Sequence, residues 1–218
     1  YLIQEIQDEK YDWLRASPDG ITTNGTMLEI KVPLSREIFG LPPIYYWYQM
    51  QHQMKVCKLN ECDFLECKIE EYSWDNFIND TYNNKMYLSN NNLEKGVIIE
   101  YLNLDENDPW NKFGYIYPNS IQMTLEDIYK WNKQHKINID NDKSKQYIRI
   151  IPWKLVKYSC VKIYRNRYWW KNNFRKIEDF WNNVLNYRQN GYQELIKEYK
   201  PRKKKMELTE YLFIDDIN

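Results

Sequence analysis

Two acids and a lysine near the N-terminus have a spacing that suits hydrolytic chemistry. Asp19 lies in the turn sequence SPDG (17–20), and nine residues separate it from Glu29, which Ile30 and Lys31 follow. Residues two apart in a strand point to the same face, so Glu29 and Lys31 project together and Asp19 approaches from the turn. Two carboxylates and the backbone carbonyl of Ile30 form an oxygen site suited to Mg²⁺, with Mn²⁺ as a substitute.

The ammonium of Lys31 has a defined use beside such a metal. It orients the attacking water and offsets the charge that builds on the oxygens of a phosphodiester, while the metal lowers the pKa of its bound water. These parts predict hydrolysis of a phosphodiester. The alternative is an aspartate in a turn and an edge strand with a solvated Glu29 and Lys31, because a P-D…E-x-K match is common by chance in a chain rich in Lys and Glu.

The elements that position these residues follow from turn signals and periodicity. Residues 11–15 and 27–32 predict two strands joined by a turn, with Leu28, Ile30 and Val32 of the second strand entering the core. Downstream, the patterns predict helices at 44–58, 76–92 (with a loop), and 124–135 (from N-cap Thr124), and strands at 63–72, 97–102 and 113–117.

The clearest element is an amphipathic helix near the C-terminus, where apolar residues repeat at three- and four-residue spacing and Gly191 follows as a stop signal. The repeating residues are Trp170, Phe174, Ile177, Trp181 and Val184.

Composition and charge narrow the class of protein. The chain has 218 residues with 43% apolar and 17% aromatic side chains, too many for a disordered chain, and no apolar run approaches the roughly 20 residues of a membrane span. Net charge is zero, but residues 143–205 carry 18 basic and 4 acidic side chains. This asymmetry favours a polyanion such as nucleic acid, and solvated lysines on helix faces are the alternative.

The cysteines and histidines exclude other chemistries. Cys57, Cys62, Cys67 and Cys160 form no C-x-x-C pair, and two histidines are too few to complete a zinc site or support a Ser-His or Cys-His mechanism. Reduced thiols predict an intracellular, reducing compartment.

Taken together, SPDG, the strand LEIK with its following proline, and the helix carrying Gln49-Met50-Gln51 resemble the phage lambda exonuclease and YqaJ-like viral recombinase family, of the PD-(D/E)XK nuclease superfamily. The strand ECDFLECKIEEY and the C-terminal helix are similar to copies in large DNA viruses of eukaryotes. The resemblance implies an α/β fold with a PD-(D/E)XK nuclease core, in which helices flank a mixed central β-sheet and the amphipathic C-terminal helix covers one face.

The resemblance also implies roles for individual residues. Asp19 and Glu29 bind the catalytic metal together with the Ile30 carbonyl, Lys31 activates the water, and Gln51 lines the site. Since Gln49 and Gln51 lie about 200° apart on a regular helix, we expect Gln51 to face the site. Gln49 and Ser17 are expected to contact the site residues rather than the metal. Gln49 is equally well explained as a surface amide.

The basic C-terminal part is expected to contact DNA phosphates without sequence preference. Trp169 or Trp170 would stack on an unpaired base, although a tryptophan at helical spacing is more often part of a core. The candidate contacts are Arg165, Arg167, Lys171, Arg175, Lys203 and Lys204.

We expect the chain to be a fragment of a longer protein, because it begins with Tyr1 in a mid-fold pattern. In the family, an upstream helix adds another glutamate to the metal site, and Glu5 and Glu9 lie too near the strand to replace it. The predicted domains are a YqaJ-like nuclease domain at 1–195, without that helix, and a basic tail at 196–218.

The predicted function is Mg²⁺-dependent exonucleolytic resection of double-stranded DNA ends in viral recombination or repair, at the viral replication site of the host cell. The resemblance implies a single-strand annealing protein and a homo-oligomer as further partners, and no membrane. The alternatives are a structure-selective endonuclease on the same core and a catalytically impaired DNA-binding module.

Overall fold

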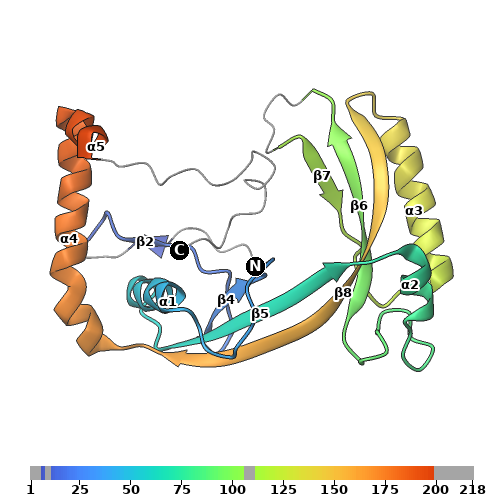
Figure 1. Ribbon diagram of the computed structural model, residues 1–218, viewed down its shortest axis with the longest axis horizontal. Coiled ribbons are helices and arrows are strands. Elements are labelled where there is room, and N and C mark those ends of the chain that lie inside the picture. Colours follow the sequence, from blue (N-terminus) through green and yellow to red (C-terminus); the bar gives the residue numbers. More distant parts are fainter. Residues whose placement is uncertain (1–5, 8–10, 106–110, 199–218) are drawn as a thin grey trace. The chain divides into compact units, whose positions relative to one another are not determined.

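The computed structural model describes residues 6–7, 11–105 and 111–198, and the chain divides into two compact units. The first unit comprises 1–66 and 159–218, and the second comprises 67–158. Each contains β-strands flanked by helices, so the predicted α/β class with a mixed sheet is confirmed (Figure 1). Glu5, Glu9, Lys203 and Lys204 lie outside the described residues, and the predicted division at 195/196 stays a prediction.

The first unit holds the β3-β4-β5-β8 part of the strand order. β3 pairs antiparallel with β4, β4 pairs parallel with β5, and β1 and β2 form a separate antiparallel pair. The elements are β1 (Ile6–Gln7), β2 (Arg15–Ala16), β3 (Gly20–Ile21), β4 (Met27–Lys31), α1 (Ile44–Val56), β5 (Glu61–Glu71), β8 (Lys145–Tyr164), α4 (Arg167–Asn190) and α5 (Gln193–Glu198), with β5 and β8 continuing into the second unit.

Helix α1 covers one face of this sheet and confirms the helix predicted at 44–58. Its apolar side chains and those of the strands form a buried cluster that removes apolar surface from water, the main stabilising term in folding. The cluster consists of Met27, Met50, Met54, Cys62, Phe64 and Ile163.

The predicted strand at 11–15 is wrong except for its last residue. The Leu14 N–H donates to the carbonyl of Tyr11 at 2.9 Å, closing a turn, and strand pairing begins only at Arg15. The turn buries Leu14 against α4, where Trp170 and Phe174 pack around it. Packing against a distant helix therefore overrides the local strand pattern.

The prediction that Leu28, Ile30 and Val32 of β4 enter the core is also wrong. Leu28 is half-buried, Ile30 is 38% exposed and Val32 is 50% exposed, whereas Met27 and Glu29 on the opposite face are buried. Strand alternation identifies two faces but does not decide which of them a helix covers. Here α1 covers the face that carries the charged pair, because its own side chains supply polar partners to Glu29.

The second unit contains α2 (Trp74–Asn79), β6 (Lys95–Asn103), β7 (Phe113–Ile116) and α3 (Leu125–Asp140), and the strand order at this end is β8-β6-β7. The predicted pair at 97–102 and 113–117 is confirmed as antiparallel β6 and β7. Helix α3 begins at Thr124, which forms a capping box with Asp127, and continues five residues beyond the predicted end at 135.

The predicted C-terminal helix is confirmed as α4. Asn166 caps its N-terminus, and Gly191 follows its last residue with a φ of +85°, a conformation that glycine adopts without steric cost. Trp170, Phe174 and Ile177 pack against a small core formed by Leu14, Ala16 and Val56. None of the helices described here has the length and apolar character needed to cross a bilayer.

A lysine is fully buried in the second unit. The ammonium of Lys95 donates to the carbonyls of Phe77 and Asp80 at the end of α2 and to the Thr81 hydroxyl, and it lies 4.4 Å from the centre of the Phe77 ring. Burial lowers the pKa of Lys95. The end of α2 therefore depends on this side chain, since terminal carbonyls have no partner within their own helix.

Replacing Lys95 with methionine should therefore lower the free energy of unfolding by about 2–4 kcal/mol, because two carbonyls lose their donor. Urea denaturation monitored by circular dichroism measures the change. The control is Lys85→Met at an exposed position of the same unit, which should change stability by less than about 0.5 kcal/mol. Equal effects of the two substitutions would contradict the capping role of Lys95.

Candidate active site

Glu29 is a buried carboxylate held by three donors. Its side chain lies on β4 and the residue is only 1% exposed. Oε1 accepts hydrogen bonds from Lys31 Nζ at 2.5 Å and Gln49 Nε2 at 2.7 Å, and Oε2 accepts one from Gln53 Nε2 at 2.9 Å. Glu29 is therefore not the solvated strand residue of the alternative reading.

The local sequence explains why these donors converge. Glu29 and Lys31 are two apart on β4 and share a face. Gln49 and Gln53 are four apart on α1, so their side chains lie one above the other on the side of the helix that meets β4. Hydrogen bonds to charged groups are the strong ones, and this set offsets the cost of burying a carboxylate beside Met27 and Met50.

Asp19 contacts the backbone between these residues. Its Oδ2 accepts the N–H of Ile30 at 2.7 Å, which places the exposed carboxylate beside the link between Glu29 and Lys31. The N–H and C=O of one residue point to the same edge of a strand, so the Ile30 carbonyl lies on the edge that Asp19 occupies. Ser17 is exposed in the preceding segment.

The structure departs from the expectation at Gln51. Its Nε2 donates to the Tyr164 carbonyl at 3.0 Å and its Oε1 accepts the N–H of Asn166 at 2.6 Å, so its amide joins the end of β8 to the start of α4. Gln49 and Gln51 do point to different sides of α1, as expected, but Gln49 is the residue that faces Glu29. Gln53 was missed by sequence reasoning, although its position one turn after Gln49 was a usable signal.

These placements predict opposite outcomes for two neighbouring glutamines. Gln49→Ala should lower catalytic turnover about tenfold with little effect on stability, because it removes one donor to Glu29 at a half-buried position. Gln51→Ala should lower the free energy of unfolding by about 2–3 kcal/mol, because a backbone donor and acceptor lose their partner. Nuclease assays and urea denaturation of both variants check this, and the reverse pattern would restore Gln51 to the site.

A second buried acid lies on the same face of the sheet. Glu66 on β5 pairs across the ladder with Lys31 and forms an ion pair with Arg36. Lys31 Nζ and the Arg36 guanidinium lie 4.9 and 5.8 Å from the centre of the Tyr46 ring. The cation of Lys31 therefore contacts both a carboxylate and an aromatic face, which limits its orientation. Sequence reasoning singled out none of Arg36, Tyr46 and Glu66.

The electrostatics of the site extend to a buried thiol. Cys62 pairs with Met27 across the ladder, and burial, followed by the negative charge of Glu29, raises the pKa of its thiol to about 12. The folded protein thus keeps a proton that the unfolded chain loses above a pKa of 9.0. Because the folded state binds more protons in that range, the free energy of unfolding should fall as pH rises from about 9 towards 12.

Comparing wild type with Cys62→Ala isolates this effect. The stability difference between the two proteins should shrink as pH increases from 8 to 11, as measured by urea denaturation at each pH. A difference that stays constant across this range would show that Cys62 does not titrate in this way.

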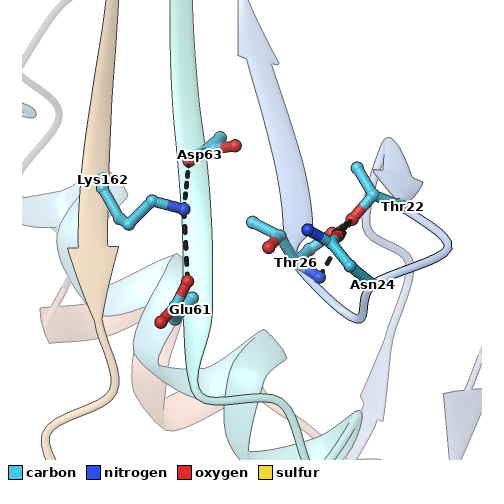
Figure 2. A network of polar contacts seen from close by, with 6 residues as sticks. All are labelled: Thr22, Asn24, Thr26, Glu61, Asp63 and Lys162. Atoms are coloured by element: carbon cyan, nitrogen blue, oxygen red, sulfur yellow. Dashed lines mark hydrogen bonds and ion pairs between the residues drawn. The ribbon is translucent and has the colours of Figure 1, made fainter.

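Polar contacts fix the strands at the rim of the first unit (Figure 2). The Thr22 hydroxyl accepts the Thr26 N–H at 3.0 Å and contacts Asn24, closing the turn that leads into β4. Lys162 on β8 bridges Glu61 and Asp63 on β5 at 3.2 and 3.0 Å, and these hydrogen bonds raise its pKa. The first network closes the turn between β3 and β4, and the second joins β5 to β8.

The donor set fits a hard divalent metal ion. Asp19, Glu29 and the Ile30 carbonyl would supply oxygen ligands, the type that Mg²⁺ prefers. Gln53 Oε1 is also buried beside Glu29, without a hydrogen-bond partner among the described residues. Within that part of the chain, no three His, Cys, Asp or Glu side chains are grouped closely enough to bind a metal by themselves. A metal here therefore needs backbone or water ligands.

The described basic candidates lie at the end of β8 and along one side of α4. Arg167 donates to the Asn60 side chain at 3.2 Å, and Arg165 is half-buried beside it. Lys171 and Arg175 are exposed on α4, four and eight residues after Arg167, so these three side chains lie on one side of the helix, 120–160° around it from Trp169 on the basis of 100° per residue. Trp170 belongs to the small core, whereas Trp169 stacks on Tyr48 with ring centres 5.1 Å apart.

A mixed sheet with a buried glutamate and a half-buried lysine on one strand, and an aspartate at the turn before it, is consistent with a nuclease core. Residues 3–60 match the family model described as the YqaJ-like viral recombinase domain. The chain is also 37% identical over 223 residues to "Uncharacterized protein R354" of Acanthamoeba polyphaga mimivirus, an alignment covering 88% of this chain and 41% of that protein.

The similarity to the YqaJ-like viral recombinase family thus lies in the N-terminal part of the chain, at residues 3–60. The chain spans about two fifths of the length of the curated relative it matches, whose name states no activity.

Proposed function

We propose that this chain is a Mg²⁺-dependent DNA exonuclease that resects double-stranded ends during recombination or repair of viral DNA. The observation that carries the proposal is the buried Glu29 in contact with Lys31, with Asp19 bound to the backbone between them. Burial of a carboxylate has a free-energy cost that these donors offset, and ionisable groups held in this way are concentrated at functional sites.

In this proposal each residue has a distinct task. Asp19, Glu29 and the Ile30 carbonyl hold the metal, which when bound acidifies a water and draws charge from the phosphate. Lys31 orients the attacking water and offsets charge on the phosphate oxygens. Gln49 and Gln53 fix the carboxylate of Glu29, and Tyr46 limits the movement of Lys31.

The cellular setting is also proposed. All four cysteines are free thiols, which suits a reducing compartment such as the viral replication site in the host cell. We further propose a single-strand annealing protein as a partner, because resection exposes a single strand that must be annealed. Further copies of this chain are proposed as a second kind of partner.

The test compares linear duplex DNA with a covalently closed circle of the same sequence, with Mg²⁺ or with EDTA. The proposal expects Mg²⁺-dependent release of nucleotides from the linear DNA and an intact circle. Cleavage of the circle would instead identify a structure-selective endonuclease, and binding without cleavage would identify an impaired DNA-binding module. The Glu29→Gln protein, purified in parallel, controls for contaminating nucleases.

A further inference from the structure

A groove lies between α1 and α4 in the first unit. It encloses about 530 Å³ and is lined by aromatic side chains from both helices, together with a few polar groups. This volume falls within the range of small-ligand pockets. Its lining includes Tyr45, Tyr48, Gln49, Trp169, Lys176 and Phe180.

The groove is connected to the candidate active site through one residue. Gln49 lines the groove, and its Nε2 also donates to Glu29 at 2.7 Å. A strand whose phosphodiester reaches Glu29 would therefore also come close to Gln49 in the wall of the groove. Apart from Gln49, the groove residues make none of the hydrogen bonds described for Glu29 and Lys31, so they are available for another part of the substrate.

The chemistry of the lining favours an unpaired nucleotide. Tyr48 and Trp169 are stacked with an interplanar angle of 14°, and Tyr45 and Phe180 are exposed. Every base has a π-face that stacks on such rings without sequence preference. The exposed Lys176 supplies a positive charge for a phosphate, and none of the lining residues is acidic.

We propose that this groove holds an unpaired nucleotide of the strand being cut, so that the preferred substrate is a DNA end with a short single-stranded overhang or frayed terminus. This inference rests on the proposed nuclease function. A peptide or a second copy of the chain would also cover aromatic side chains, but neither accounts for the lysine, the lack of acids and the shared Gln49.

The experiment measures binding of duplexes with a blunt end or a three-nucleotide overhang in EDTA, where cleavage is prevented. The overhang carries 2-aminopurine, whose fluorescence falls on stacking. Wild type should bind the overhang more tightly and quench the probe. Phe180→Ala and Tyr45→Ala should weaken overhang binding by about 5- to 100-fold and restore the fluorescence, while blunt-end binding changes less.

Two matched controls are available on α4. Tyr168 is 76% exposed but does not line the groove, so Tyr168→Ala should leave the overhang preference unchanged. Arg188→Gln is the equivalent control for Lys176→Gln, since both cations are exposed on α4 but only Lys176 lines the groove. Phe180 is 68% exposed, so its truncation should not unfold the chain, which circular dichroism verifies.

Nuclease activity is measured separately with Mg²⁺ on the same duplexes. If wild type cleaves DNA but the groove variants keep the overhang preference, the groove inference is wrong and the proposed function stands. If wild type neither cleaves nor binds DNA, the proposed function fails and the inference fails with it. Loss of self-association in Phe180→Ala, detected by sedimentation and with DNA binding unchanged, would assign the groove to a second copy.

Discussion

Glu29→Gln is expected to reduce Mg²⁺-dependent DNA hydrolysis by at least about 10³-fold while the protein stays folded. Glutamine has nearly the shape of glutamate, so it fits beneath α1, but it removes the negative charge that would hold the metal. The buried position of Glu29 strengthens the effect, because water cannot easily replace the missing ligand.

The stability of this variant separates the proposed role from a structural one. The oxygen of the new glutamine still accepts from Lys31 and Gln49, and its N–H can donate to Gln53 Oε1, which has no partner among the described residues, once the Gln53 amide turns over. We therefore expect the free energy of unfolding to change by no more than about 2 kcal/mol. Glu126→Gln on α3, an exposed glutamate paired with Lys130, is the matched control and should retain full activity. Persistent cleavage by the Glu29→Gln protein would remove this residue from the active site.

Lys31→Met is expected to lower the rate of bound-substrate cleavage by about 10²–10³-fold while changing the dissociation constant for DNA less than threefold. The substitution keeps the aliphatic length against Tyr46 but removes the ammonium that orients water and balances developing charge. Single-turnover cleavage with Mg²⁺ and DNA binding in EDTA measure the two quantities separately.

The control is the same substitution at a lysine outside the candidate active site. Lys133→Met, at an exposed position on α3 in the second unit, should leave turnover unchanged. Equal losses of turnover and affinity in Lys31→Met would show that Lys31 binds DNA rather than assisting the chemical step.

Much of the fold was predictable from local sequence. Thr124 and Asp127 marked the start of α3, and the repeat from Trp170 to Val184 with Gly191 marked α4. These signals are local, because a cap or a helical stripe requires only neighbouring residues. The twenty-residue strand β8 was not predicted, since it contains Pro152 and lacks a clean alternation of apolar and polar residues.

The site was predictable in its residue types but not in its arrangement. Asp19, Glu29 and Lys31 follow from spacing, whereas the choice between Gln49 and Gln51 depends on which side of α1 meets β4. Because the sequence does not show which face of β4 the helix covers, it also gave the wrong prediction that Leu28, Ile30 and Val32 enter the core. Contacts between elements far apart in sequence, such as Gln51 with Tyr164, leave no local pattern.

The most direct test of the account is Mn²⁺ binding, followed by electron paramagnetic resonance of the free ion. Wild type should bind Mn²⁺ at a site that is lost in both Asp19→Asn and Glu29→Gln and kept in Glu126→Gln. Mn²⁺ binding that is unchanged by both site substitutions would contradict the claim that these two acids hold the catalytic metal.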